Sequence, residues 1–337
     1  CFGLLYSQGG ACCPRATAQP LPMQPAGIRE LWEEQLTGHG FGSSALRVYE
    51  STAGIAAWEF SERPYLVVWL HGMHTGPIST RDLEKMQRRL WRRVIYLVPE
   101  SPEQSNGFLF SWGCAFTKTQ NRKDMGYVNG SMQTPFLSAL TVKVNEAADF
   151  FNAERVIAIG YSMGGFGAFQ LGSFAPEAYD AIISVAGYGM GTLEPTEKCG
   201  APQPKASEVF QDFLETHIAY LADVPIVLGI HAPNDSMSSF RDVSAIIAKV
   251  EETAHWYRKQ STARLVEVPE DMANSDYPKK RRKQGGHGYF NCSLVKDRSE
   301  EFLWQELREL LQTSPKRQRL PGSSKHATAH DSPDGWW

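Results

Sequence analysis

The sequence has no long apolar run, few cysteines and no excess of charge of either sign. Its longest uninterrupted apolar stretches, residues 66–70 and 225–230, are far shorter than the roughly 18 to 20 residues that cross a bilayer. We therefore expect no transmembrane segment. Lysine and arginine total 34 against 37 aspartate and glutamate residues, a net charge of −3, so we expect no nucleic acid partner.

The six cysteines in 337 residues include no CxxC pair and are too irregularly spaced for a disulfide scaffold or a zinc cluster. The cysteine content therefore does not indicate whether the protein resides in an oxidising or a reducing compartment. With 42% hydrophobic and 21% charged residues, the composition is that of a globular protein, which excludes collagen-like, coiled-coil and wholly disordered classes. The chain starts at Cys1, so we expect a processed or incomplete N-terminus, and we take a soluble, cytoplasmic protein as the starting hypothesis.

Three regions differ in composition. Residues 1–27 contain several prolines and are interpreted as an irregular N-terminal arm. Residues 313–337 are rich in proline, serine, histidine and basic residues without apolar periodicity, which predicts a disordered tail. Residues 28–312 remain as one domain, a size that a single α/β core can reach.

Within this domain, apolar runs that predict buried parallel strands alternate with apolar residues at helical spacing. The predicted strands are residues 65–70, 94–98, 156–159, 181–185, 226–230 and 265–268, and the predicted helices are residues 79–92, 134–151, 163–174, 206–221, 240–257 and 299–311. Residues 46–49 and 55–60 predict an opening antiparallel hairpin around the turn-prone stretch 51–54. This order is typical of an α/β protein with a mostly parallel central sheet and helices on both faces.

A Gly-x-Ser-x-Gly motif lies between the predicted strand at 156–159 and the predicted helix at 163–174. It consists of Gly160, Tyr161, Ser162, Met163 and Gly164. In a strand-turn-helix setting, this motif presents the serine hydroxyl on a strained turn, and a Cβ at either glycine would collide with the neighbouring strand or helix. The start of the helix also directs unpaired backbone N–H groups toward the serine. The alternative is a glycine-rich turn that only lets the helix pack closely on the sheet.

Residues 157–168, together with 174–177 and 186–187, resemble the α/β-hydrolase fold. They are most similar to predicted esterases and peptidases related to polyhydroxybutyrate depolymerases, feruloyl esterases and phospholipase/carboxylesterases. The resemblance runs from about residue 65 to residue 311 and is strongest at the Ser162 turn. Residues 104–130 and the basic loop before residue 285 fit it poorly.

The resemblance implies a catalytic triad in the chain order serine, acid, histidine. His287, in the glycine-flanked loop 285–289 before the last helix, is the histidine that this order selects. Asp235 follows the strand at 226–230 and is the predicted acid, with Asp242 as the reserve candidate. His231 ends that strand but precedes the acid. A solvated loop position for His287 and a turn-capping role for Asp235 are the alternatives.

The end of the first core strand, His71-Gly72-Met73-His74, resembles the oxyanion loop of these enzymes. By that resemblance, the backbone N–H groups of Met73 and Met163 would hold the developing oxyanion. His71 and His74 are also possible metal ligands, but two histidines in a loop without a third ligand are a weak signal for a metal site. Trp112 is interpreted either as a wall of the substrate pocket or as core packing.

Five consecutive cations, residues 279–283, stand just before His287. They allow three interpretations: a solvated surface loop, a nuclear localisation patch, or a rim that attracts anionic substrates or lipid headgroups. The sequence does not separate them.

Taken together, the motifs predict a serine hydrolase that cleaves carboxylic esters through an acyl-enzyme intermediate. The alternatives are a noncatalytic hydrolase-fold binding protein and a peptidase or thioesterase that uses the same triad. The expected substrate is a small-molecule or lipid-like ester. No cofactor is implied, because this mechanism needs only protein groups and water. The oligomeric state and the identity of the substrate are left open.

Overall fold

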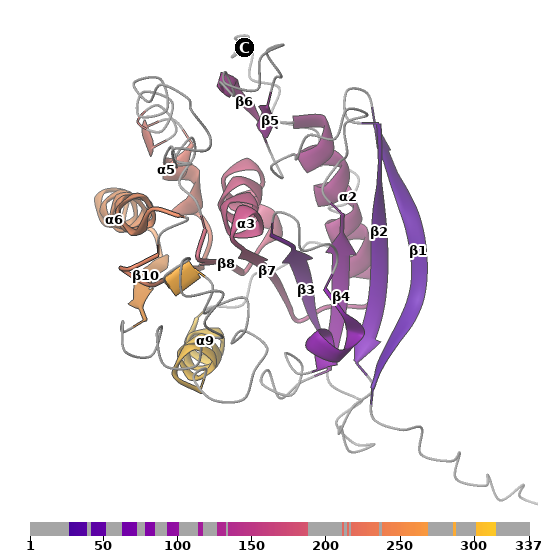
Figure 1. The fold of residues 1–337 in the computed structure, drawn as a ribbon. Helices are drawn as coiled ribbons and strands as arrows, with labels where there is room; N and C mark the ends of the chain where they lie inside the picture. Colours follow the sequence, from indigo (N-terminus) through magenta and orange to yellow (C-terminus); the bar gives the residue numbers. More distant parts are fainter. Residues whose placement is uncertain are drawn as a thin grey trace, which may run out of the picture.

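The computed structural model describes residues 27–38, 42–51, 63–72, 78–84, 93–100, 114–116, 127–132, 134–187, 211, 214–215, 217–235, 238–268, 286–287 and 301–314. Its centre is a sheet of eight strands in the order β1-β2-β4-β3-β7-β8-β9-β10 (Figure 1). The predicted N-terminal arm lies almost wholly outside the described residues, as does nearly all of the predicted C-terminal tail. Among the helices that the structure describes, none has both the length and the apolar character of a membrane span.

The parallel part of the sheet confirms the predicted alternation. It consists of β4 (Val94–Pro99), β3 (Tyr65–Leu70), β7 (Arg155–Tyr161), β8 (Ala181–Val185), β9 (Ile226–His231) and β10 (Thr262–Glu267). Every residue of β3, β4, β7, β8 and β9 is buried. Continuous apolar runs are what strands covered on both faces require.

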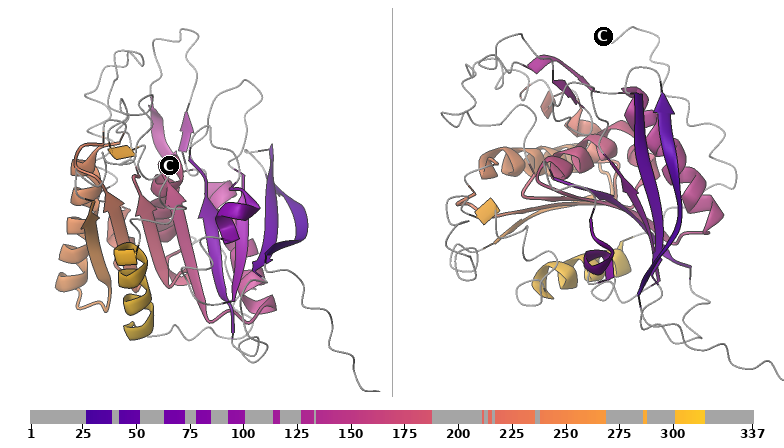
Figure 2. Two further views of the ribbon diagram at one scale, coloured as in Figure 1. Left: turned by 60° about the horizontal axis from the view of Figure 1, so that its bottom comes forward. Right: turned by 45° about the vertical axis from the view of Figure 1, so that its right-hand side comes forward.

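Helices cover both faces of the sheet (Figure 2). On one face lie α2 (Thr134–Phe150), α3 (Met163–Phe174) and α6 (Phe240–Trp256), and on the other lies α9 (Glu301–Thr313). Strand β3 shows how the two cores divide, because Leu66 and Val68 pack with the first set, whereas Val67 and Trp69 pack on the α9 side. Alternate strand residues point to opposite faces, so one strand contributes to both cores.

The opening hairpin exists, but its strands differ from the predicted pair. It is formed by β1 (Ile28–Gly38) and β2 (Gly42–Ser51), and β2 also pairs with β4 in the antiparallel sense. The predicted strand 46–49 lies within β2, while residues 55–60 lie outside the described residues. The partner of β2 is therefore the preceding segment, to which the sequence pattern assigned no element.

Smaller elements lie outside the central sheet and its main helices. Within residues 104–130, which fit the resemblance poorly, and just beyond them, β5 (Cys114–Phe116) and β6 (Tyr127–Met132) form a separate antiparallel pair. A short 3-10 helix, η2 (Pro176–Ala178), precedes β8. Of the predicted helix 206–221, the structure describes helical residues at 211, 214–215 and in α5 (Ile218–Leu221).

Candidate active site

Ser162 lies on a tight turn between the end of β7 and the start of α3. Its φ of 56° and ψ of −118° are in a region that non-glycine residues rarely adopt and that costs about 1–3 kcal/mol. The turn is held on both sides: the Ser162 N–H donates to Val185 O at 2.8 Å, and Ser162 O accepts from the Phe166 N–H at 3.2 Å. The hydroxyl is therefore presented from a fixed, strained backbone.

The two motif glycines make this turn sterically possible. A Cβ on Gly160 would lie 1.8 Å from Gly164 O, and a Cβ on Gly164 would lie 2.0 Å from Leu70 O. Both contacts are with backbone atoms, which cannot swing away as a side chain can. The end of β7, the first turn of α3 and the end of β3 thus approach one another closely beneath Ser162.

Asp235 follows β9 in a turn closed by its own N–H, which donates to Ala232 O at 3.1 Å. Its side chain is fully buried. Ser238 contacts both carboxylate oxygens: its N–H donates to Oδ1 at 3.0 Å, and its Oγ lies 2.8 Å from Oδ2. The reserve candidate Asp242 lies instead in the first turn of α6, where its N–H donates to Ser239 Oγ at 3.3 Å.

His287 reaches Ser162 from a segment far along the chain. The preceding residue, Gly286, donates its N–H to Asn234 O at 3.3 Å, which ties this segment to the loop that carries Asp235. The Tyr161 hydroxyl donates to His287 O at 3.0 Å, and the two rings lie 5.4 Å apart. The backbone of His287 is thereby fixed next to the Ser162 turn.

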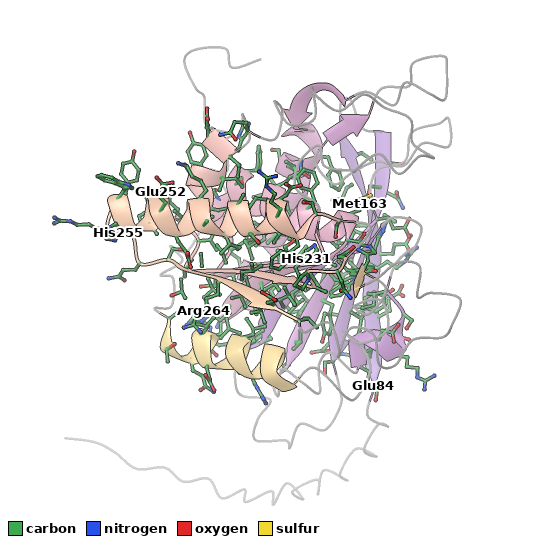
Figure 3. All side chains as sticks on the ribbon, turned by 60° about the vertical axis from the view of Figure 1, so that its left-hand side comes forward. Glu84, Met163, His231, Glu252, His255 and Arg264 are labelled. Carbon is green, nitrogen blue, oxygen red and sulfur yellow. The ribbon has the colours of Figure 1, made fainter. Side chains whose placement is uncertain are left out.

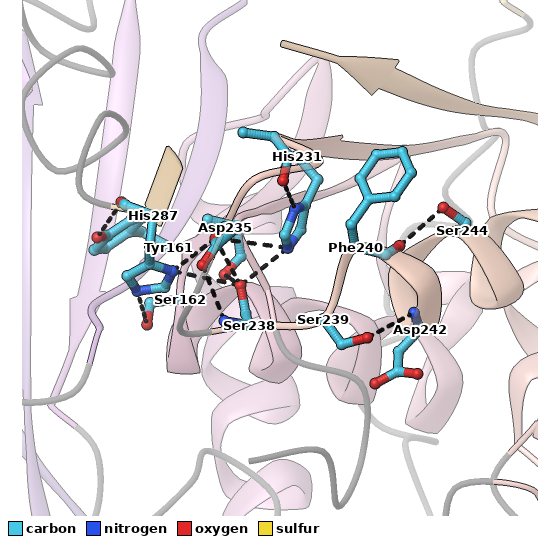
Figure 4. A network of polar contacts seen from close by, with 12 residues as sticks. Tyr161, Ser162, His231, Asp235, Ser238, Ser239, Phe240, Asp242, Ser244 and His287 are labelled. Atoms are coloured by element: carbon cyan, nitrogen blue, oxygen red, sulfur yellow. Dashed lines mark hydrogen bonds and ion pairs between the residues drawn. The ribbon is translucent and has the colours of Figure 1, made fainter. Parts of the chain in front are cut away.

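The three predicted side chains form one hydrogen-bonded line (Figure 4). Ser162 Oγ lies 3.0 Å from His287 Nε2, and His287 Nδ1 lies 2.9 Å from Asp235 Oδ2. The ionised carboxylate only accepts, so Nδ1 carries the proton and Nε2 accepts from the serine hydroxyl. Ser162 and His287 are 4% and 6% exposed, so the line is shielded from bulk water. Chemically, this arrangement allows a histidine to take a proton from a serine and a carboxylate to stabilise the resulting imidazolium.

No motif in the sequence points to Ser238, which bonds Asp235 and also lies 2.9 Å from His231 Nε2. A serine three residues after the acid is a weak signal, because serine is common in loops for other reasons. For His231, the sequence offers only the role of a general base that precedes the acid in the chain. The structure brings it to Ser238 and within 3.8 Å of Asp235 Oδ2, not to Ser162.

The predicted oxyanion groups are described only in part. Met163 is the first residue of α3, is buried, and lies next to Ser162 in the chain. Met73, His74, Trp112 and the basic residues 279–283 lie outside the described residues. His71 is described: burial, the largest influence, lowers its pKa, and its Nδ1 lies 2.8 Å from Gly72 O.

Comparison with known proteins gives a likeness of fold. No family model matches the chain, and no curated protein matches it significantly. A thermostable esterase superposes with a TM-score of 0.50 at 16% identity, over 84% of this chain and 63% of the esterase, so this chain spans less than two thirds of that protein. A ferulic acid esterase gives 0.48 at 11% identity, over 86% of this chain and 99% of that one.

A third solved structure superposes less well. It is XC6422 from Xanthomonas campestris, described as an a/b serine hydrolase without lid, with a TM-score of 0.43 at 14% identity over 88% of this chain and all of that one. At such identities a likeness speaks to the fold and not to the activity. The order and direction of the strands in this chain, with helices on both faces of the sheet, are those of an α/β-hydrolase fold. The chain has the α/β-hydrolase fold.

Proposed function

We propose that the protein is a serine hydrolase that cleaves carboxylic esters through an acyl-enzyme intermediate. The observation that carries the proposal is the line Ser162 Oγ, His287 Nε2, His287 Nδ1 and Asp235 Oδ2, with its contacts of 3.0 and 2.9 Å. A buried serine on a strained turn, within hydrogen-bond reach of an imidazole that a buried carboxylate orients, is the arrangement of an activated nucleophile.

In the acylation step, Ser162 Oγ attacks the ester carbonyl carbon while His287 Nε2 takes the hydroxyl proton. Asp235 keeps the imidazole in the required tautomer and stabilises the imidazolium. When the tetrahedral intermediate collapses, the bond to the alcohol oxygen breaks and His287 returns the proton to the leaving alkoxide. A water molecule then repeats these steps on the acyl-enzyme, releasing the acid and restoring Ser162.

The negative charge that develops on the carbonyl oxygen needs hydrogen-bond donors. We assign this role to the backbone N–H groups of Met163 and Met73. Met163 supports the assignment because it follows Ser162 at the start of α3, where N–H groups lack intrahelical partners and the helix dipole is positive. For Met73 the support is the resemblance of residues 71–74 alone. Trp112 stays a proposed wall of the substrate pocket.

Labelling with a fluorophosphonate probe tests the nucleophile directly. We expect the probe to label the wild type and to leave Ser162→Ala unlabelled. The matched control is Ser173→Ala on the same helix, whose hydroxyl donates to Phe169 O at 2.8 Å, and it should label like the wild type. Absence of labelling in a well-folded wild type would refute the proposal and favour a noncatalytic binding protein.

A panel of p-nitrophenyl esters of increasing acyl length then tests the substrate class. Hydrolysis that depends on Ser162 and peaks at one acyl length supports an ester hydrolase, either of short-chain or of lipid-like substrates. Loss of Ser162 should lower kcat by at least about 10³-fold, because residues of a triad act as a unit. Labelling without ester turnover would instead point to a peptidase or a thioesterase.

A further inference from the structure

A second histidine lies behind the carboxylate that faces His287. His231 is the last residue of β9, its side chain is 0% exposed, and the ring of Phe240 packs on it at 5.8 Å. In Figure 3, His231 lies deep in the molecule, while His255 lies at the outer end of α6. Burial of a polar ring costs free energy unless its nitrogens are hydrogen-bonded. The partners of the two His231 nitrogens therefore matter for its role beside the proposed site.

The link between His231 and the site is the hydroxyl of Ser238 (Figure 4). Ser238 Oγ lies 2.8 Å from Asp235 Oδ2, 3.0 Å from Ala186 O, 2.9 Å from His231 Nε2 and 3.4 Å from His287 Nδ1. A hydroxyl has one proton to donate. The Asp235 carboxylate and the Ala186 carbonyl can only accept, so these two already compete for that proton.

The tautomer of His231 determines whether its Nε2 can also accept the hydroxyl proton of Ser238. Its Nδ1 lies 3.0 Å from Ala232 O, and a carbonyl oxygen only accepts, so Nδ1 carries the ring proton. In the neutral ring, Nε2 then has only a lone pair. Toward Ser238, His231 is therefore a third acceptor.

Burial, the largest influence, lowers the pKa of His231, and the nearby His287 lowers it further. The negative charge of Asp235 and the backbone hydrogen bonds of the ring with Ala232 and Gly187 act in the opposite direction, without cancelling the effect of burial. On the neighbouring strand β10, the register partner of His231 is Glu267, which is exposed. His231 is thus held in its neutral, accepting form at neutral pH.

We propose that His231 is a positioning residue that acts through Ser238: its Nε2 competes with Asp235 for the single hydroxyl proton of Ser238 and so sets how strongly Asp235 holds His287. This inference rests on the proposed function. Each hydrogen bond that a carboxylate accepts spreads its negative charge and weakens its attraction for other donors. By drawing the Ser238 proton away, His231 leaves more of the charge on Asp235 Oδ2 for the imidazolium that His287 becomes during turnover.

Two substitutions should therefore move the acid limb of the kcat/KM profile in opposite directions. Ser238→Ala removes the competing donor, so Asp235 holds the imidazolium more strongly and the limb moves to higher pH, by about half a unit. His231→Leu removes the competing acceptor, so the Ser238 proton goes to Asp235 and the limb moves to lower pH by a similar amount. KM should change less than about twofold, because both side chains are buried behind Asp235.

The double variant tests whether His231 acts through Ser238. In the Ser238→Ala background, His231→Leu should cause no further shift of the acid limb. The matched controls are Ser244→Ala, whose hydroxyl donates to Phe240 O at 2.8 Å, and His255→Gln at the far end of α6. Neither should move the limb. Shifts in the same direction, or loss of activity with an unmoved limb, would overturn the proposal in favour of a merely structural role.

NMR of the imidazole nitrogens in the unmodified protein needs neither turnover nor a variant that folds. We expect His231 to be the neutral tautomer with a protonated Nδ1 and a bare Nε2. A protonated Nε2 in the neutral ring would overturn the proposal. Because this readout does not depend on catalysis, failure of the inference is distinguishable from failure of the proposed function, which absence of probe labelling at Ser162 reports.

Discussion

At the scale of single residues, the site depends on two glycines, which have no side chain, as much as on the residues that carry the chemistry. The Ser162 turn brings three backbone segments together at Gly160 and Gly164, and an added methyl group at either position meets a carbonyl oxygen. Strain of this kind persists only where the surroundings impose it. Here the surrounding strands β3, β7 and β8 are fully buried, so the turn cannot relax without moving the core.

Gly160→Ala should accordingly be far more damaging than the same change at Gly229. The added Cβ on Gly160 would meet Gly164 O at 1.8 Å, whereas on Gly229 it would meet side-chain atoms, Val243 Cγ1 at 2.8 Å and Ile247 Cγ1 at 3.1 Å. We expect Gly160→Ala to lower the free energy of unfolding by more than about 4 kcal/mol or to prevent folding. Gly229→Ala should cost about 1–3 kcal/mol. Urea unfolding followed by circular dichroism measures both, and equal costs would contradict the steric account.

At the scale of elements, the sequence predicts the helices and strands whose local residue pattern agrees with the way they pack in the fold. The bounds of α3 and β8 are those predicted. The glycine-flanked turn at Ser162 fixes where α3 begins, and a short continuous apolar run marks β8. Strand β1 was missed because residues 28–38 include glutamate, glutamine and leucine, which favour helices in isolation. Pairing with β2 over ten register positions overrides that local preference.

In the candidate site, too, the sequence points to residues that carry a motif or follow a chain-order rule, and not to residues placed by tertiary contacts alone. Ser162 carries a motif, and Asp235 and His287 follow from chain order once the fold is suspected. Ser238 and His231 carry no such signal, because their importance comes from the fold of the Asp235 loop, which brings Ser238 back against the end of β9. Contacts of that kind depend on loop geometry, which a single sequence does not specify.

Besides the pairing of β2 with β4, a buried carboxylate links the opening hairpin to the rest of the sheet, and we expect this link to make the free energy of unfolding depend on pH in the acid range. Glu50 on β2 accepts from the guanidinium groups of Arg29 on β1 and Arg93 before β4. Burial, the largest influence, raises the pKa of Glu50, but the two arginines together outweigh it and leave the pKa below its ordinary 4.5. The contribution of Glu50 to stability is therefore complete above the ordinary pKa and is lost as pH falls through the lowered one.

Glu50→Gln should lower the free energy of unfolding at pH 7 by about 1–3 kcal/mol, since charged hydrogen bonds are lost. The difference from the wild type should shrink as the pH falls below 4.5. The control is Glu33→Gln, which faces Arg47 at 2.9 Å with a 41% exposed side chain and should cost less than about 1 kcal/mol. Denaturant titrations over a pH series measure both. A pH-independent gap for Glu50→Gln would contradict the linkage.

At the scale of the whole molecule, the proposed triad depends on segments that meet only in the finished fold. Ser162 follows β7, Asp235 follows β9, and His287 comes 52 residues later, before α9. The carboxyl ends of neighbouring parallel strands lie at one edge of the sheet, which is where ligands bind in such folds. Helix α9 packs Leu307, Leu310 and Leu311 on the face of the sheet opposite to α2, α3 and α6.

One buried arginine joins α9 to the centre of the sheet. Arg155, at the start of β7, is 1% exposed and donates through Nη2 to Leu311 O at 2.8 Å and to Ser314 O at 2.6 Å. Its Nη1 lies 3.3 Å from Asp180 Oδ1, and Asp180 Oδ2 accepts from the Val156 N–H at 2.8 Å. The guanidinium thus links the C-terminal end of α9, where carbonyls lack helical partners, to two neighbouring strands.

Arg155→Met should lower the free energy of unfolding by about 3–5 kcal/mol, because it leaves the Asp180 charge buried without its cation and removes the donors from two carbonyls. Arg155→Lys keeps the charge but loses the planar fork, so we expect an intermediate cost. The matched control is Arg63→Met: Arg63 also donates to two carbonyls, Asn152 O at 2.9 Å and Ala153 O at 2.8 Å, but is exposed, and its loss should cost less than about 1 kcal/mol. If α9 depends on this link, limited proteolysis will cut Arg155→Met within residues 301–314 faster than the control. Equal cleavage of the two variants would mean that apolar packing alone holds the helix.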